Sequence, residues 1–506
     1  MKIDNPPIQC DVFVYGSTPG GIAAALEAAR GGLKVILACP KMHLGGMAAS
    51  GLCTTDAVRR HLFGALVGEF VERVRNYYLK ILGENSPEYK LCHDGWYYEP
   101  SVAEICFNEM LEYESTNLSC LKGQFLQSVK TEQGAIKTVS LANKKNEITC
   151  IAARVYIDGT YEGDLAASAG VPYRVGRESR EEFGESLAGI HYMNWRTGRE
   201  IITELSGDAS PAIQSFCARS IITDDPAHLV KIEKPASYDL HLQDYIPILG
   251  DFKSAMVKSV DDIVMGALLP GRKQEINGHI EALTSLNCPG VSWEYPEAGY
   301  KLREELDKFH VEHAAGLLYF LQNDPHVPSE IASHLRKFGL HDEEFKDNNN
   351  WPWQIYVRQG RRIKGRAVIT QHNFIVNPET GRTPEVEGAV ALGEHSFDIH
   401  PCHDRRYSRD SFAEGVLWYP AKDKGPAQPG QIPYGALLPV NFDNLIVPVA
   451  MSCTHIAMSV LRMEPVWMTT GQIAGAAAVF AVEKNCSPAG LDPHIITRKL
   501  NIRNTP

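Results

Sequence analysis

The residues best suited to proton transfer lie in the segment GEHSFDIHPCHD, residues 393–404, which contains His395, His400 and His403 among acidic neighbours. An imidazole can accept or supply a proton near neutral pH. We therefore predict that His400 or His403 acts as an acid or base, with a hydrogen-bonded structural histidine as the alternative for each. The spacing matches no recognised zinc or iron site, so we predict no metal here.

A second group of residues that could bind or react with a ligand lies in the arginine-rich stretch WPWQIYVRQGRRIKG, residues 351–365. Arg358 lies three and four residues before Arg361 and Arg362, so these side chains would share one face if the stretch were helical. Guanidinium groups suit carboxylates or phosphates. Salt bridges between separate parts of the chain are an equally good explanation.

The element that would position such groups is a glycine turn near the start of the chain. An apolar run at 11–15 is followed by the turn GSTPGG at 16–21, an alanine-rich segment at 22–30 and a second apolar run at 34–38. This order predicts strand, turn, helix and strand, the first βαβ unit of a dinucleotide-binding fold. The helix N-terminus would offer N–H groups to a pyrophosphate.

Two positions depart from the usual fingerprint of this turn. Thr18 stands where the middle glycine of G-x-G-x-x-G is expected, and Cys39 follows the second strand where an acidic residue would bind the ribose. An ordinary strand–helix turn therefore remains an alternative. The predicted cofactor contacts in this unit are Gly16, Thr18, Pro19, Gly20, Gly21 and Cys39.

The rest of the chain shows periodic segments in a definite order. Apolar spacing predicts helices over 62–78, 102–111, 301–323 and 471–482, and alternation predicts a β-meander over 125–129, 136–141 and 148–157. A buried strand is expected at 444–449. We divide the chain into an N-terminal cofactor-binding part (1–185), a substrate or cap domain (186–350) and a C-terminal part that completes the cleft (351–506).

Three motifs carry a more specific resemblance. They are LGGM at 44–47 with ASGL at 49–52, DGTYEGD at 158–164, and RMEPVWMTTGQ at 462–472. Together they resemble the FAD-dependent oxidoreductases related to the flavoprotein subunit of fumarate reductase and succinate dehydrogenase. The resemblance implies cofactor contacts from Gly45, Gly46, Met47, Asp158, Gly159, Asp164, Arg462 and Gly471, with the last helix aimed at the flavin.

The resemblance implies an α/β fold, namely an FAD-binding Rossmann-like domain of the glutathione-reductase type with a β-meander and an inserted α+β cap domain. It implies FAD as cofactor and hydride exchange between flavin N5 and a small organic substrate, by C–OH oxidation or by C–C desaturation or reduction. A sugar-like substrate is weakly preferred. The candidate catalytic residues are His400, His403, His455 and Arg361. The resemblance supports two of them: His455 matches the family histidine upstream of RMEP, and the segment of Arg361 is implied to line the flavin cleft.

One dinucleotide motif is present and not two, so we expect an external electron acceptor or donor. Two other functions stay open. One is a flavoprotein lyase or isomerase without net redox change, and the other is a nucleotide-fold scaffold that has lost its cofactor.

Composition limits the partners and the location. The 506 residues carry a formal net charge of −11 without a basic block, so we expect no nucleic-acid partner. No apolar run reaches the ~20 residues of a membrane helix, so we expect no membrane partner. Twelve cysteines without a C-x-x-C pair predict reduced thiols in a cytoplasmic protein. The sequence does not define the oligomeric state.

Overall fold

The chain folds around the predicted glycine turn in a computed structural model, which describes residues 6–194, 200–202, 206–280, 282–405, 412–420 and 427–502. Strand β1 (Ile8–Tyr15) leads into the turn, helix α1 (Pro19–Arg30) follows it, and β2 (Val35–Ala38) pairs with β1 in parallel. The predicted βαβ unit is therefore present.

The central sheet has seven strands and joins both ends of the chain. Its order is β3-β2-β1-β6-β5-β4, and β21 pairs with β6. Strands β3 (Leu118–Leu121), β6 (Ile148–Asp158) and β21 (Leu445–Ile446) extend the parallel part. Strands β4 (Phe125–Glu132) and β5 (Ala135–Ala142) run antiparallel to their neighbours and form the predicted β-meander with β6.

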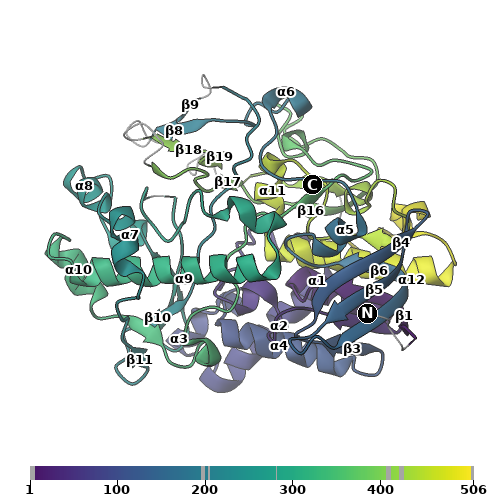
Figure 1. Cartoon of the computed structure of the whole chain (residues 1–506), viewed down its shortest axis with the longest axis horizontal. Coiled ribbons are helices and arrows are strands. Elements are labelled where there is room, and N and C mark those ends of the chain that lie inside the picture. The colour runs from purple at the N-terminus through teal and green to yellow at the C-terminus, as the bar shows by residue number, and fades with distance from the viewer. Residues whose placement is uncertain are drawn as a thin grey trace.

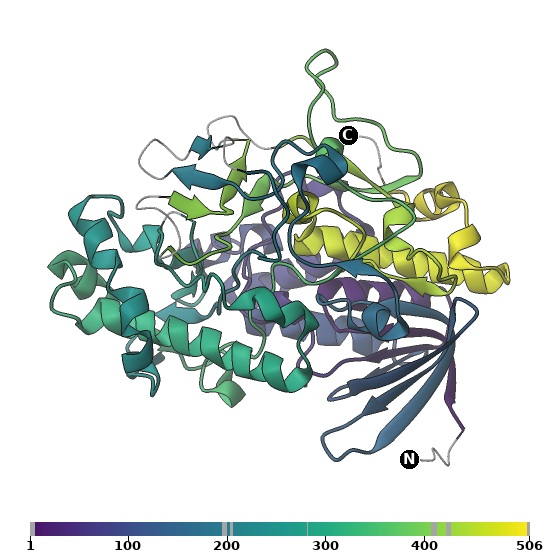
Figure 2. The ribbon, with the colours of Figure 1, turned by 45° about the horizontal axis from the view of Figure 1, so that its top comes forward.

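Helix α12 (Glu464–Glu483) packs along α1 and is buried over nearly its whole length. Figures 1 and 2 show this yellow helix beside the purple N-terminal segment, although the two are far apart in the sequence. The helix begins at Glu464, seven residues before the predicted start at Gly471, because Pro465 suits the first turn of a helix and Met463 is still extended. Helix α11 (His455–Leu461) precedes it.

Among the helices that the structure describes, α12 is the one long and apolar enough to cross a membrane. However, 89% of its most apolar window is buried inside the protein. A core helix of a folded domain has this character as well. The thiols of all twelve cysteines are free.

A second sheet lies in the middle of the chain. Its five strands are antiparallel in the order β11 (Leu229–Val230), β14 (Gly339–His341), β10 (Ile221–Thr223), β13 (Lys273–Ile276) and β12 (Met265–Leu269). The long helix α9 (Tyr300–Asn323) matches the predicted helix and runs beside α7 (Tyr238–Tyr245) and α10 (Ser329–Leu335) (Figure 1). Helix α8 (Ile248–Lys253) follows α7.

The remaining described elements cover these two sheets or link them. The predicted N-terminal helices are α2 (Ala65–Leu82) and α4 (Pro100–Tyr113), with the short α3 (Pro87–Lys90) between them. Helix α5 (Asp164–Ala169) follows β6, α6 (Arg180–Phe183) lies further along, and α13 (Pro493–Leu500) is C-terminal. Small antiparallel pairings are formed by β7 (Tyr173–Arg174) with β15 (Arg362–Ile363), β16 (Ala389–Gly393) with β20 (Gly430–Pro433), β17 (Phe397–Ile399) with β19 (Leu417–Tyr419), and β8 (Tyr192–Asn194) with β9 (Glu200–Ile202) and β18 (Phe412–Glu414).

The arginine-rich stretch is extended and not helical. Tyr356 forms an isolated bridge with Cys217, and β15 starts at Arg362. Its arginines therefore do not share a helical face, and they reach different partners in the cleft.

Candidate functional site: a glycine-lined cofactor turn and a buried arginine cluster

The turn after β1 is packed against the end of β6. Gly16 has a φ of 105°, and a Cβ on it would lie 2.6 Å from the backbone of Gly159. A Cβ on Gly21 would overlap the carbonyl oxygen of Gly16. These glycines let the strand, the turn and the helix start approach closely, which is one of the roles that glycines have in dinucleotide-binding turns.

Thr18, at the place of the missing middle glycine, turns its hydroxyl into the protein. The hydroxyl donates to the carbonyl of Gly159 (2.6 Å) and accepts from the N–H of Gly21 (3.1 Å), so Thr18 is the N-cap of α1. Pro19 occupies the first position of the helix, where a missing N–H is tolerated. A threonine fits this turn because its hydroxyl both donates and accepts a hydrogen bond within the protein.

The end of β2 carries no carboxylate. Burial raises the pKa of the Cys39 thiol, which donates to the carbonyl of Lys41 (3.3 Å). The N–H of Gln124 donates to the carbonyl of Cys39 (2.8 Å), and Oε1 of Gln124 is buried without a partner among the described residues. This amide oxygen could accept a ribose hydroxyl. Nothing in the sequence pointed to Gln124, because it comes from a different strand connection.

The acidic motif after β6 organises the chain locally. Asp158 is buried, which raises its pKa to about 6, and it accepts from the hydroxyl (2.7 Å) and N–H (3.0 Å) of Thr160 and from the N–H of Ala166 (2.8 Å). Asp164 binds Arg303 (2.6 Å) and Arg361 (2.9 Å). Burial alone would raise the pKa of Asp164, but these two guanidiniums lower it. Arg361, a predicted catalytic residue, is thus held in an ion pair beside the cofactor domain.

The LGGM loop is tied to the start of α12 through Tyr161. The hydroxyl of Tyr161 accepts from the N–H of Met47 (2.9 Å) and donates to Oε1 of Glu464 (2.6 Å). Gly45 and Gly46 have φ values of 98° and 52°, and a Cβ on Gly46 would lie 3.1 Å from Cα of Thr18. The loop and the glycine turn therefore meet, as a bound dinucleotide would require.

Glu464 is a buried acid at the N-terminus of α12. Burial raises its pKa to about 8, and its Oε2 has no partner in the described part of the chain. It is therefore largely protonated at neutral pH.

Gly471, further along α12, packs against Gly20. A Cβ at position 471 would overlap the carbonyl oxygen of Gly20. Gly471 and Gly20 thus set the close contact between α12 and α1, and the helix end near the LGGM loop is at Glu464.

Three arginines surround the ring of Tyr356. The guanidinium carbons of Arg219, Arg358 and Arg462 lie 4.1, 4.9 and 5.9 Å from the ring centroid. Such contacts are favourable cation–π interactions. We call these four residues the arginine cluster. Arg358 belongs to the arginine-rich stretch singled out from the sequence, whereas Arg219 was not predicted, because the sequence does not show that distant segments converge on one tyrosine.

Arginine charge is compensated at two positions of the cluster and not at the third. Arg219 pairs with Glu275 (3.0 Å), and Arg462 pairs with Asp398 (2.7 Å). Arg358 is fully buried, donates to the carbonyl of Ser215 (2.5 Å) and contacts Sγ of Cys217 (3.5 Å), and no described carboxylate lies within ion-pair distance of it.

His400 lies next to the cluster. Its Nε2 is 3.6 Å from Oδ2 of Asp398. Burial and the nearby charge of Arg358 lower the pKa of His400 to about 3, although Asp398 acts in the opposite direction. The imidazole is therefore neutral in the folded protein near pH 7, and its Nδ1 is buried without a described partner. Asp398 stays ionised, because His400 and Arg462 lower its pKa against the effect of burial.

The other two predicted histidines lie apart from His400. Nδ1 of His455 is 2.7 Å from Oε1 of Gln359, and burial lowers the pKa of His455 well below its usual value. Nε2 of His455 has no described partner. His403 is half-buried, lies 3.9 Å from Glu414 and packs edge-on against Trp293. The structure thus brings together Arg462 and His400, with His455 and His403 in separate settings.

Several buried polar atoms around the cluster have no hydrogen-bond partner among the described residues. They are Nε of Arg358, Nε of Arg462, Nδ1 of His400, Oδ1 of Asp398, Nε2 of Gln214 and Oγ of Ser215. Buried polar groups in native proteins are nearly always paired. The donor and acceptor set therefore fits a polar ligand at this place, and the glycine cradle fits a dinucleotide beside it.

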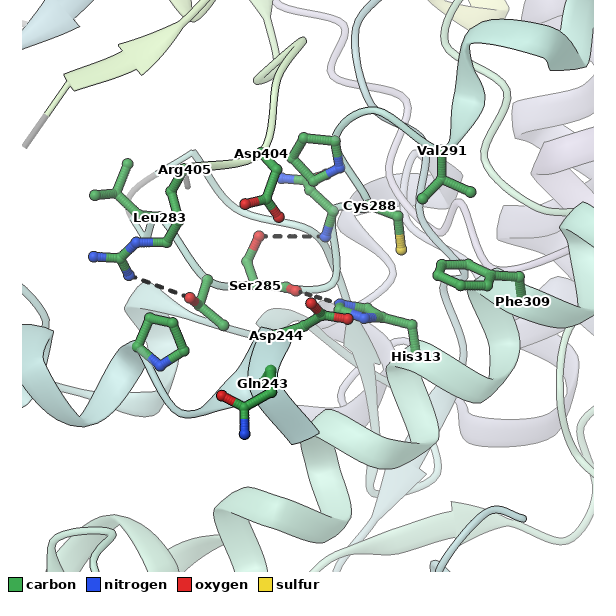
Figure 3. A pocket seen from close by; sticks show the side chains of 14 residues that line it. Gln243, Asp244, Leu283, Ser285, Cys288, Val291, Phe309, His313, Asp404 and Arg405 are labelled. Atoms are coloured by element: carbon green, nitrogen blue, oxygen red, sulfur yellow. Dashed lines mark hydrogen bonds between the residues drawn. The ribbon is translucent and has the colours of Figure 1, made fainter. Parts of the chain in front are cut away.

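A cavity of about 110 Å³ opens between α7, α9 and the loop 283–291. Figure 3 shows the carboxylates of Asp244 and Asp404 directed towards the space around Ser285. Cys288 in its wall donates its N–H to the carbonyl of Phe216 (3.0 Å), the residue after Ser215. The cavity is therefore separated from the arginine cluster by one chain segment.

Away from the cleft, His228, His341 and Glu343 place their ligand atoms within 4.8 Å of one another. The two imidazoles stack almost parallel, with 5.0 Å between centroids and 10° between planes. The lone pairs of an imidazole lie in the plane of its ring, so lone pairs in these two stacked, nearly parallel planes do not converge on one ion, and we assign no metal to this group.

The chain has distant similarity to several solved structures. The chain is similar to a geranylgeranyl bacteriochlorophyll reductase-like protein from Thermoplasma acidophilum (10% identity, 98% of this chain and 83% of that chain, TM-score 0.35). It is also similar to a glycerol-3-phosphate dehydrogenase from Bacillus halodurans complexed with FAD (13%, 43% and 40%, 0.26). A third similarity is to Sdh1 from Mycobacterium smegmatis in complex with UQ1 (12%, 43% and 42%, 0.25).

The alignment spans 25% of the L-proline dehydrogenase from P. horikoshii and 36% of AlpK, so it covers well under half of these chains. No curated protein matches the sequence. The profile of the FAD dependent oxidoreductases matches residues 11–500, from the first strand to the last helix. A match of this length places the chain in the FAD dependent oxidoreductase family, and FAD is its cofactor.

Proposed function

We propose that the enzyme oxidises or reduces a small organic substrate held between the glycine-lined cofactor turn and the arginine cluster. The chemistry is C–OH oxidation or C–C desaturation or reduction by hydride exchange with flavin N5. Bound FAD supplies the two-electron chemistry. The chain supplies the cradle of Gly16, Gly21 and Gly46 and a polar cleft that binds the substrate.

The observation that carries this proposal is the unpaired Nδ1 of His400. A neutral, buried imidazole with an open nitrogen can take the proton of a substrate hydroxyl. Asp398, 3.6 Å from the other nitrogen, offsets the positive charge that then forms on the ring. His455 also has an unpartnered nitrogen, Nε2, but its other nitrogen faces the amide oxygen of Gln359 rather than a carboxylate, and His403 packs against Trp293. We propose smaller, supporting roles for these two histidines.

Four further statements belong to the proposal. The nearer relation to the fumarate reductase and succinate dehydrogenase flavoproteins is supported by the order of the LGGM and RMEP motifs. Residues 186–350 are proposed as a cap domain, supported by the separate five-stranded sheet. An external electron acceptor or donor follows from the single dinucleotide motif. A cytoplasmic location follows from the cysteine pattern.

The test is anaerobic addition of candidate substrates to the FAD-loaded protein. We expect bleaching of the flavin absorbance with a substrate, and at least ~100-fold slower bleaching in His400→Gln, because general acid–base catalysis contributes about 10²–10⁴-fold. The FAD content of this variant should equal that of the parent. Product formation without an acceptor and without bleaching would show a lyase or isomerase instead.

A further inference from the structure

We propose that the substrate is a hydroxy monocarboxylate whose carboxylate binds at Arg358 and whose hydroxyl hydrogen-bonds to Nδ1 of His400. This inference rests on the proposed function, because it names the substrate class of the same site.

The charge of Arg358 favours an anionic ligand. Arg219 and Arg462 each have a carboxylate partner, whereas buried Arg358 has a carbonyl and a thiol. An isolated charge in a protein interior is strongly unfavourable unless it is paired. One anionic group of a ligand would pair it. A neutral polyol would leave this charge uncompensated.

The unpartnered hydrogen-bonding atoms near Arg358 favour a ligand that also carries a hydroxyl group. The unpartnered atoms near Arg358 include donors, on Gln214 and Ser215, and also acceptors, Nδ1 of His400 and Oδ1 of Asp398. A carboxylate accepts hydrogen bonds and donates none, so it satisfies only the donors. A hydroxyl on the same ligand supplies the missing donor. Both sets are satisfied together by a molecule that carries a carboxylate and at least one hydroxyl.

The arginine cluster has room for only one negative charge of a ligand. Arg219 and Arg462 are already paired with Glu275 and Asp398, whereas Arg358 has no described carboxylate partner. A second carboxylate on the ligand would therefore find no unpaired guanidinium in the arginine cluster, which favours a single acid group.

Anion binding at Arg358 would also activate His400. Arg358 is the second cause, after burial, of the low pKa of His400. A carboxylate at Arg358 offsets this positive charge, so His400 becomes a stronger base when substrate is bound. The chemical balance is simple. The carbinol carbon loses a hydride to FAD, the hydroxyl proton goes to Nδ1 of His400, a C=O bond forms, and an external acceptor later removes the two electrons.

The test uses FAD-loaded protein and matched probes. We expect anaerobic bleaching with lactate or gluconate, and none with propane-1,2-diol, glucitol or propionate. For binding without turnover, 2-hydroxy-2-methylpropanoate has no hydrogen on the carbinol carbon, and calorimetry should detect it. Its affinity should fall ~10–100-fold in Arg358→Gln, as expected for loss of a charge-assisted hydrogen bond. Arg366→Gln, which removes an exposed arginine paired with Asp443, is the matched control and should bind normally.

Competition binding to the parent protein tests the same proposal without depending on correct folding of the Arg358→Gln variant. Propionate should compete with 2-hydroxy-2-methylpropanoate, and propane-1,2-diol should compete far more weakly. If diols bleach the flavin as well as hydroxy acids do, and Arg358→Gln binds the probe normally, the substrate class proposed here is wrong while the redox function stands. If no alcohol or acid bleaches the flavin, the redox function fails first.

Discussion

The cofactor turn and the arginine cluster are both buried, yet they are built in opposite ways. In the turn, Thr18 uses its hydroxyl twice within the protein, and glycines let backbone pack on backbone. In the cluster, Arg358 and His400 keep polar atoms without described partners. The comparison suggests that the turn is shaped by packing of the chain on itself, whereas the cluster is completed by a ligand.

The strongest test of the packed turn is Gly21→Val. A side chain there would meet the carbonyl oxygen of Gly16, so the contact between β1 and α1 must open. We expect a loss of unfolding free energy on the order of 3 kcal/mol or more, with little FAD retained. Urea unfolding and the flavin absorbance of the purified protein measure both.

Gly68→Ala is the control for this variant. Gly68 lies within α2, and a Cβ there would meet no atom within 4 Å. An alanine in a helix interior should raise the free energy of unfolding by ~0.5–1 kcal/mol. If both glycine variants behave alike, close packing of the turn is not the reason for its glycines.

Glu464 follows Arg462 by two residues and accepts a hydrogen bond from Tyr161, which contacts the LGGM loop. It allows a sharper test, because burial raises its pKa to about 8. The folded protein keeps this proton between about pH 4.5 and 8, where the unfolded chain has released it. The stability contributed by this proton is therefore complete below about pH 4.5, falls by up to ~1.4 kcal/mol per pH unit between about pH 4.5 and 8, and changes no further above pH 8. Glu464→Gln cannot ionise, so we expect it to match the parent near pH 5 and to be more stable at pH 9.

Urea unfolding at pH 5, 7 and 9 measures this difference, and other titrating groups cancel between parent and variant. Parallel curves would mean that Glu464 is ionised in the folded protein. It would then resemble Asp398, whose carboxylate is stabilised by charged neighbours.

The fold was largely accessible from the sequence, and the cluster was not. Strand and helix periodicity predicted β1, α1 and the β-meander, because each pattern is local. The start of α12 was placed seven residues late, since glycines that pack α12 on α1 resemble a helix start. Arg219 joins Arg358 only through the path of the folded chain, and no spacing in the sequence encodes that. Arg361, chosen from its neighbours, pairs with Asp164 instead.

The smallest expected effect is at Thr18. Its measurement shows whether the hydroxyl or the shape of the threonine side chain lets it stand in place of the missing glycine. Thr18→Val keeps the shape but leaves the carbonyl of Gly159 and the N–H of Gly21 without their partner, at a cost of ~1–3 kcal/mol. Thr18→Ser keeps the hydroxyl and should lose well under half as much. If the valine variant is as stable as the serine variant, the hydroxyl does not support the turn, and Thr18 is tolerated there for its shape alone.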